Sequence, residues 1–451
     1  MNTESKKMIK SFLNIGDVEC DVFILSVKFN LESGFHKINS FPILFQPLLL
    51  IILSCMSSVF VSALNFLYLK RHNNSTDRVF YSACDYNNRF FYLERCLHIN
   101  SFSVVYLPPI SLKLWMKHWK SRKWNVYFNS FSFGDLANFL FQCFSSIRVL
   151  HSLNKSLDTF NKLESRHIFK VLLQFKLYDI HVNNTDSIRN YQIGISKKYI
   201  FDYERGNLFP LLIKLNKSGA KTIHFQHGLM QKPNNFYLPA LAKFVFCCSM
   251  REKHLYIDSG FPEKSVFVLG SPIQTFHFDD GMNVLQPLVK YDLLIILGST
   301  EVSIYESFQR DCLKMIGDSF KGLTVLCRFR PASRSLDRLK LARDLQSFVV
   351  SENSSLDFDI MSSKVVVSFS FDAAFVSFRY ERPTCLAAPL TEVDIRLKDV
   401  CVDSPLKLIS GIKNMLHKEN NKQYLENIKL LLGEYDFNVY KTRLVNAILY
   451  V

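Results

Sequence analysis

The feature that most constrains this chain is a regular alternation of short apolar strands and helical segments that begins near residue 195. The segments KKYIFDYE, KTIHFQHG and AKFVFCCS read as strands, and the stretches NLFPLLIKLNKSG and MREKHLYIDSG between and after them read as helices. Each helical pattern ends at a glycine, Gly219 or Gly260, which is a common helix stop signal. Short apolar strands alternating with helices are typical of a parallel sheet that is covered on both faces.

The alternation restarts at VKYDLLIILGST, after a join near residues 275–290. Further strands are expected at LTVLCRFRP, SKVVVSFS and TCLAAP, and helices at 303–320, LDRLKLARDLQSF, FDAAFVSFRYERP and 422–432. We therefore predict an α/β fold with two parallel-sheet domains, residues 1–285 and 286–451. Ligands of such sheets bind beyond the carboxyl ends of the strands, and the cleft between two domains is the default site.

Composition narrows the class of protein and its partners. A chain of 451 residues with 48% hydrophobic and 21% charged residues has the profile of a folded protein large enough for two domains. The net charge of +15 favours an anionic partner, either nucleic acid, an anionic membrane or a phosphate-bearing substrate. The eleven cysteines include no CxxC pair, which argues against a disulfide framework or structural zinc and fits a reducing compartment.

Two segments of the first 150 residues bear on membrane contact. Residues 41–69 contain no charged residue and exceed the roughly 20 apolar residues that a span needs, but prolines interrupt them. A transmembrane span, a buried core helix and an interfacial helix all remain open for this run. The second segment, LKLWMKHWKSRKW, places Trp115, Trp119 and Trp124 among lysines and arginines.

The tryptophan-rich segment suits an anionic membrane surface, because Trp prefers the headgroup region and Lys and Arg are drawn to anionic lipid. A solvated basic helix whose Trp face packs on the core explains the pattern equally well. No recognisable nucleic-acid module accompanies the segment, so we do not expect nucleic acid as a partner.

The candidate general bases follow two strands of the first unit. His227 comes directly after the strand KTIHF and before Gly228, where imidazole could deprotonate an acceptor hydroxyl. Glu204, in the segment FDYERGN, is the corresponding carboxylate candidate at another strand end. The alternative for His227 is a histidine bonded to local backbone in a turn.

Candidate phosphate ligands lie in strand-to-helix turns. Gly270-Ser271 and Gly298-Ser299-Thr300 offer backbone N–H groups and hydroxyls near a helix N-terminus. Ordinary turn chemistry explains each of these two motifs equally well when it is considered alone.

Two further motifs place side chains at strand ends of the second unit. The side chains of Arg328 and Arg330 point from the same face of a strand and could hold a diphosphate. The alternative is that both are solvated charges at the edge of the sheet. Ser368, Ser370 and Asp372 precede or begin a helix, where they could bind one phosphate or merely cap the helix.

The order of these motifs from residue 195 to 390 resembles glycosyltransferases of the GT-B type, which have two Rossmann-type domains facing a central cleft. The nearest likeness is to bacterial capsule and lipopolysaccharide transferases that use CMP-activated Kdo or sialic acid. CDP-glycerol polyol-phosphate transferases are similar as well. The individual motifs are short, and their order and spacing carry the likeness.

The resemblance implies a site and a reaction. It maps an active-site histidine onto His227 and a donor-phosphate serine pair onto Ser368 and Ser370. A His-Pro pair of those families reads Arg330-Pro331 here, which puts any acid role at that position in doubt. The implied reaction is metal-independent and cofactor-free transfer from a pyrimidine nucleotide donor to a lipid-linked or oligosaccharide acceptor, at the cytoplasmic face of the membrane.

Three other functions remain open from the sequence. A CDP-polyol phosphotransferase and a nucleotide-sugar 2-epimerase are alternatives among enzymes. The epimerase requires additional catalytic carboxylates, which we cannot place in the sequence. A non-catalytic membrane scaffold of a polysaccharide assembly complex is the alternative outside enzymes.

Overall fold

The computed structural model describes the two sheets with their helices and part of the N-terminal region. The described residues are 3–13, 15–17, 19–21, 23–24, 78–82, 96–97, 103–106, 126–128, 133–146, 171–173, 175–177, 179–180, 197–201, 208–226, 230, 238–271, 288–298, 303–329, 348–351, 354–380, 382–389, 401–417 and 436–451.

The first sheet has seven strands in the order β3-β2-β1-β4-β5-β6-β7, and every neighbouring pair is parallel. Its strands are β1 (Arg78–Ser82), β2 (Ser103–Tyr106), β3 (Val126–Phe128), β4 (Lys198–Phe201), β5 (Lys221–Phe225), β6 (Phe244–Cys247) and β7 (Val266–Val268). The chain thus builds the sheet outward from β1 in one direction and then outward from β4 in the other.

Helices cover both faces of this sheet. Helix α10 (Phe209–Lys217) begins with a proline in its first turn, which suits a position where the N–H would have no helical partner. Helix α11 (Met250–Asp258) follows β6 and buries Leu255 and Tyr256 against Val245 and Cys247 of that strand. A short 3-10 turn, η4 (Glu263–Ser265), leads into β7.

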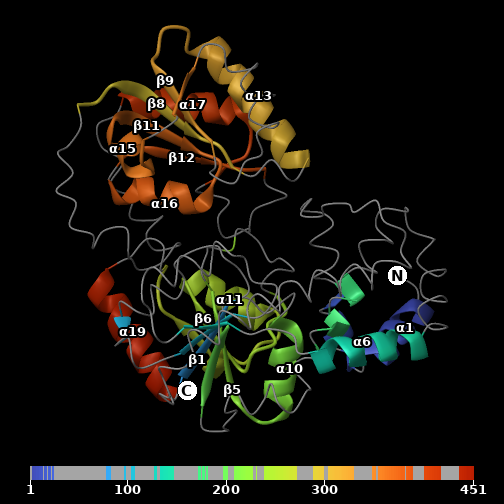
Figure 1. Ribbon diagram of the computed structural model, residues 1–451. Coiled ribbons are helices and arrows are strands. Elements are labelled where there is room, and N and C mark those ends of the chain that lie inside the picture. Colours follow the sequence, from blue (N-terminus) through green and yellow to red (C-terminus); the bar gives the residue numbers. More distant parts are fainter. Residues whose placement is uncertain are drawn as a thin grey trace.

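The N-terminal helices pack beside α10. Helix α1 (Thr3–Leu13) and helix α6 (Phe133–Ser145) share one apolar cluster with the described residues of 171–180. Phe209 and Ile213 of α10 belong to the same cluster, and the three helices lie together in Figure 1. This N-terminal layer is therefore continuous with the first sheet unit.

The second sheet has six parallel strands in the order β10-β9-β8-β11-β12-β13. Its strands are β8 (Tyr291–Ile296), β9 (Val325–Arg328), β10 (Val349–Val350), β11 (Ser363–Ser368), β12 (Thr384–Ala387) and β13 (Cys401–Val402). Its helices are α13 (Ser303–Ser319), α15 (Leu356–Met361), α16 (Phe371–Arg379) and α17 (Pro405–His417). This strand order is the doubly wound, Rossmann-type order.

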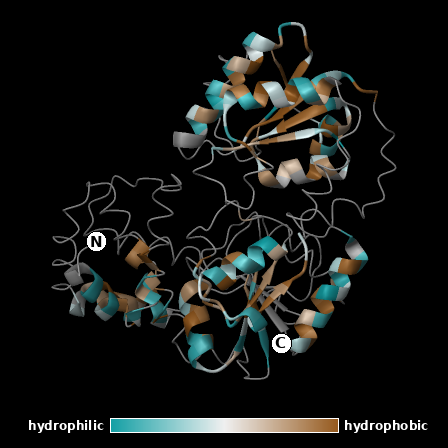
Figure 2. Ribbon diagram, turned by 180° about the vertical axis from the view of Figure 1, so that it is seen from behind, coloured by the Kyte–Doolittle hydropathy of each residue, from teal (hydrophilic) through white to brown (hydrophobic). Residues whose placement is uncertain are grey.

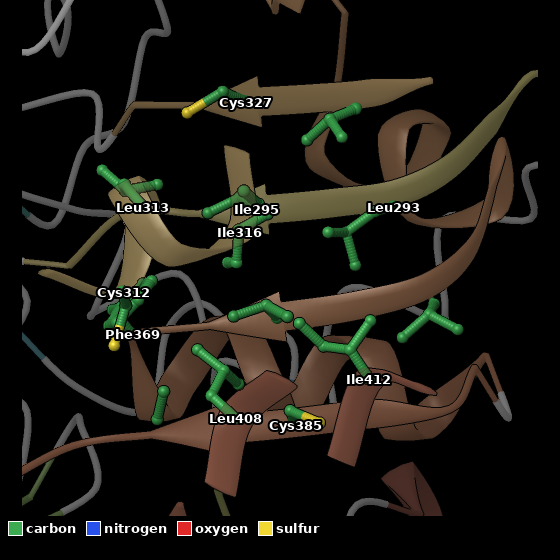
Figure 3. Close-up of a cluster of buried hydrophobic side chains, with 14 of the residues drawn as sticks. Leu293, Ile295, Cys312, Leu313, Ile316, Cys327, Phe369, Cys385, Leu408 and Ile412 are labelled. Atoms are coloured by element: carbon green, nitrogen blue, oxygen red, sulfur yellow. The ribbon is translucent and has the colours of Figure 1, made fainter. Parts of the chain in front are cut away.

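Alternate residues of each central strand supply two separate cores. Leu293, Ile295 and Val367 face α13 and α17, in the cluster drawn in Figure 3. Leu294 and Ile296 face the opposite way, against α15 and α16. Figure 2 shows the same pattern as apolar strands between helices with polar outer faces. The fold is therefore α/β with two parallel-sheet units, as the sequence predicts.

The C-terminal helix α19 (Phe437–Tyr450) packs on the first sheet, although it follows the second sheet in the chain. Its residues Tyr440, Leu444 and Ile448 contact a cluster that includes Ile223 and Phe246. Figure 1 shows this red helix beside β1 and β6. This packing differs from our assignment of all residues 286–451 to the second unit, because the apolar face of α19 completes the first core.

Several expectations fall on residues outside the described ranges: the apolar run 41–69, Trp115, Trp119 and Trp124, residues 336–347 of one expected helix, and the helix at 422–432. Within the ranges that are described, no helix combines the length and the apolar character needed to cross a membrane.

Candidate functional site

The strand orders place one topological switch point in each sheet. In the first sheet it lies between β1 and β4, and in the second between β8 and β11. Connections leave such neighbouring strands in opposite directions, which opens a crevice at their carboxyl ends where ligands bind in sheets of this kind. The second switch point brings Gly298 and the segment Ser368–Ser370 to the same edge.

Gly298 lies against the backbone of the neighbouring turn. The N–H of Phe369 donates to the carbonyl of Ile296 at 2.9 Å, which holds the two strand ends together. A Cβ added to Gly298 would lie 2.5 Å from the carbonyl oxygen of Phe369, so only glycine fits. The Gly298 N–H donates to Oε1 of buried Gln309 on α13 at 3.0 Å, so this N–H serves the fold. Ser299 and Thr300 lie outside the described residues.

The two serines of the second switch point have different surroundings. Ser368 is fully buried, and its hydroxyl donates to the carbonyl of Ser370 at 2.7 Å while accepting from the Ser370 N–H at 3.2 Å. Ser368 therefore shapes the turn. Ser370 is half-buried at the N-cap of α16, and its side chain makes no capping hydrogen bond. Of the two hydroxyls, Ser370 is the better placed to meet a phosphate at the helix N-terminus.

Asp372 lies in the first turn of α16, and its side chain is outside what the structure describes. Arg330 lies outside the described residues as well.

Arg328 is held in a polar network within the second unit. Its Nη1 lies 2.6 Å from Oδ2 of buried Asp359 and also donates to Ser351 Oγ and the Ser354 carbonyl. A guanidinium with these partners links β9 to α15. This geometry favours a structural role over the phosphate contact that the strand position suggested.

Gly270 and Ser271 follow β7, the edge strand of the first sheet. Gly270 has φ +108°, a conformation that glycine adopts readily, and Ser271 is fully buried. These two residues are therefore three strands away from β4 at the switch point of their own sheet.

The candidate bases follow two adjacent strands of the first sheet. Strands β4 and β5 pair in parallel, with Phe201 opposite His224. Glu204 comes after the end of β4 and His227 after Gln226 at the end of β5, and both lie outside the described residues.

A buried polar cluster, which we did not predict, lies around the end of β5. It comprises Gln226, Ser249, Arg251, Glu252 and Tyr256, all of which are buried. Ser249 caps α11, and Glu252 stands at the fourth position of the Ser-x-x-Glu pattern of a capping box. This pattern was the sequence signal that could have found the cluster.

Glu252 departs from the usual capping box in what its carboxylate binds. Its two oxygens accept from the backbone N–H groups of Met230, at 2.5 Å, and of Cys248, at 3.0 Å. Burial raises the pKa of Glu252, while the positive charge of Arg251 and these hydrogen bonds act in the opposite direction.

No group of three or more His, Cys, Asp or Glu side chains that could hold a metal ion occurs in the described parts of the chain.

Comparisons with known proteins add a fold likeness at low sequence identity. No family model matches this chain. No curated protein matches it either. Among solved structures, it is similar to a protein described as a UDP-N-acetylglucosamine 2-epimerase from Listeria monocytogenes, with 13% identity and a TM-score of 0.51. That alignment covers 83% of this chain and 96% of the other.

The UDP-GlcNAc 2-epimerase of Methanocaldococcus jannaschii is also similar, with 12% identity, a TM-score of 0.50, and coverage of 83% of this chain and 99% of that one. The strand orders and these likenesses together define a GT-B-type fold.

Proposed function

We propose that this chain is a glycosyltransferase that moves a sugar from a CMP-activated or other pyrimidine nucleotide donor to a growing cell-surface polysaccharide. The fold and the order of its motifs support this function.

The observation that carries the proposal is the meeting of Gly298 with the Ser368–Ser370 turn at the second switch point. These segments are far apart in the sequence, and the motif pattern assigns both to the donor phosphate. Because Gly298 has no Cβ, its backbone can lie close to that of Phe369. The N-terminus of α16, with Ser370, lies at the same edge of the sheet. A diphosphate bound there would be stabilised by the helix dipole and by backbone N–H groups.

In the proposed reaction an acceptor hydroxyl oxygen attacks the anomeric carbon while the bond from that carbon to the donor phosphate oxygen breaks. His227 or Glu204 takes the hydroxyl proton. The negative charge that develops on the departing phosphate is stabilised by the N-terminus of α16, by Ser370 and by Arg330. No metal ion or cofactor is required by this scheme.

The acceptor is proposed to be a lipid-linked or oligosaccharide chain. Trp115, Trp119, Trp124 and their basic neighbours would hold the enzyme at the cytoplasmic face of the membrane, where such an acceptor is available. This part of the proposal rests on the sequence of that segment.

Nucleotide binding tests the proposal most directly. We would measure the shift in melting temperature with CMP, CDP, UDP, GDP and ADP, and repeat it for Ser370→Ala. A ligand that binds only the folded state raises the melting temperature as its concentration exceeds Kd. We expect a pyrimidine nucleotide to stabilise the protein and Ser370→Ala to weaken that response.

Ser410→Ala is the matched control, because Ser410 is exposed on α17 and this helix covers the other face of the sheet from α16. No stabilisation by any nucleotide would contradict the enzyme and favour the scaffold alternative. A stabilising nucleotide sugar that is converted to its 2-epimer without an acceptor would favour the epimerase. Transfer of a polyol phosphate would favour the phosphotransferase.

A further inference from the structure

We propose that Arg251 and Glu252 are positioning residues that fix the residues on either side of segment 227–229, whose sequence contains the candidate base His227. This inference rests on the proposed function, and it adds two residues for which the motif pattern assigns no role.

The backbone of Met230, the first described residue after this segment, is held at both of its polar groups. Its N–H donates to Oε1 of Glu252 at 2.5 Å, and its carbonyl accepts from Nη2 of Arg251. Met230 itself is fully buried. Two adjacent charged side chains on the first turn of α11 therefore hold the backbone of one residue in place, through the peptide units on both sides of it.

Gln226, the last described residue before this segment, is bonded to the same helix. The side chain of Gln226 hydrogen-bonds the Glu252 carboxylate, and its Oε1 accepts from the Tyr256 hydroxyl at 3.2 Å. The Gln226 N–H donates to the carbonyl of Phe246 on β6 at 3.0 Å. Both ends of segment 227–229 are thus attached to β6 and α11.

The charges make a purely stabilising role a poor explanation. Arg251 and Glu252 are 3% and 0% exposed, with 3.6 Å between Nη2 and Oε1. Burying such a pair costs desolvation that its mutual attraction barely offsets, and apolar residues often serve stability equally well. What the pair adds is directional bonding, because Arg251 binds the Met230 carbonyl and the two Glu252 oxygens bind the N–H groups of Met230 and Cys248.

Amide hydrogen exchange tests the anchoring without any need for activity. In the unaltered protein we expect strong protection of the Met230 and Cys248 amides. In Glu252→Gln one carboxylate oxygen is replaced by an NH2 group that cannot accept, so we expect exchange to rise by about tenfold or more at whichever of the two amides loses its acceptor. Equal exchange in both proteins would overturn the proposal.

Transfer kinetics test the positioning role. Glu252→Gln and Arg251→Met should lower kcat by about 100-fold with little change in nucleotide affinity, because a small misplacement of a reacting group has effects of this size. Arg251→Lys retains a donor and should recover part of the loss. The pH profile of kcat/KM should lose the acidic limb that a histidine base gives.

Thr222→Val is the matched control. Thr222 is fully buried at the other end of β5, where its hydroxyl donates to Asn216 Oδ1 at 2.6 Å and accepts from the Lys243 N–H at 3.0 Å. This variant should lower the melting temperature and leave kcat unchanged. If kcat falls in proportion to the melting temperature in all variants, Arg251 and Glu252 have a structural role only.

The two proposals fail separately. If no nucleotide sugar is turned over but amide exchange at Met230 depends on Glu252, the anchoring of Met230 is confirmed and the transferase assignment fails. If transfer occurs and Glu252→Gln exchanges and reacts like the unaltered protein, the positioning role alone is wrong.

Discussion

Arg328 at the end of β9 and Asp359 on α15 form an ion pair, with Nη1 2.6 Å from Oδ2. Asp359 is 2% exposed and also accepts from the hydroxyls of Ser351, at 2.6 Å, and Ser354. Asp359→Ala would leave Arg328 and two serine hydroxyls without this acceptor. We expect the free energy of unfolding of the second unit to fall by about 3 kcal/mol or more, measured by urea denaturation.

Glu306→Ala is the matched control for that prediction. The pair between Arg310 and Glu306 spans 2.9 Å on α13, but its side chains are 51% and 40% exposed. Exposed pairs of this spacing contribute about 0.5 kcal/mol or less. Equal losses in the two variants would mean that burial of Asp359 does not determine its contribution.

Gly298→Ala should damage the second switch point. The new Cβ would lie 2.5 Å from the Phe369 carbonyl oxygen, and neither backbone segment can yield without moving β8 or β11. We expect a loss of about 1–3 kcal/mol in stability. Nucleotide binding should weaken as well, because the strand ends that hold the proposed site would separate. Denaturation and nucleotide titration of the same variant check both effects.

The same substitution at Gly317 should have the opposite sign. Gly317 lies inside α13, and the nearest atom to an added Cβ is Cζ of Phe348 at 3.9 Å, an ordinary contact. Alanine in a helix interior is favoured over glycine by about 1 kcal/mol. Gly317→Ala should therefore stabilise the protein, and a loss at both glycines would contradict the steric argument for Gly298.

Local sequence patterns were sufficient where a feature depends on neighbours in the chain. Strands β4, β5, β6, β8, β9, β11 and β12 follow apolar runs, and Gly298 and Ser370 follow from the turns that end two of them. A parallel sheet then brings these strand ends to one edge. The proximity of Gly298 and Ser370 at the second switch point was therefore predictable.

Other features depend on partners distant in the sequence, and a pattern within one segment could not supply them. The apolar face of α19 does not show which sheet it covers. The strand position of Arg328 does not reveal Asp359, whose helix α15 is only six residues long. Glu252 binds Met230 across 22 positions, so its capping pattern alone predicts a local partner.

The packing of α19 on the first sheet predicts contrasting effects at two leucines of that helix. Leu444 is fully buried in the cluster with Ile223 and Phe246, whereas Leu449 is 65% exposed. Leu444→Ala should lower the free energy of unfolding by about 2–5 kcal/mol, and Leu449→Ala by less than about 0.5 kcal/mol. Thermal or urea unfolding of both variants checks this, and similar values would place α19 elsewhere.

The last prediction concerns acid pH and the start of β8. Oδ1 of Asp292 lies 2.7 Å from Lys364 Nζ, and Oδ2 accepts from the N–H and hydroxyl of Thr324, each at 2.9 Å. The hydrogen bond from Lys364 and then the Thr324 N–H lower the pKa of Asp292 below its ordinary value. Because the folded state favours the ionised form, its stabilisation is complete above the unfolded pKa of about 3.9 and is lost as pH falls through the folded value.

Asp292→Asn should therefore be less stable than the unaltered protein by a constant amount above about pH 5, and the difference should shrink at lower pH. Lys364→Met removes the largest cause of the shift and should reproduce part of this behaviour. Added salt should weaken the effect, since Lys364 is 60% exposed and its charge is screened. Urea midpoints measured from pH 2.5 to 7 for the three proteins check the sign. A difference that widens on acidification would mean that the folded state prefers the protonated carboxyl, which contradicts the hydrogen-bonding geometry of Asp292.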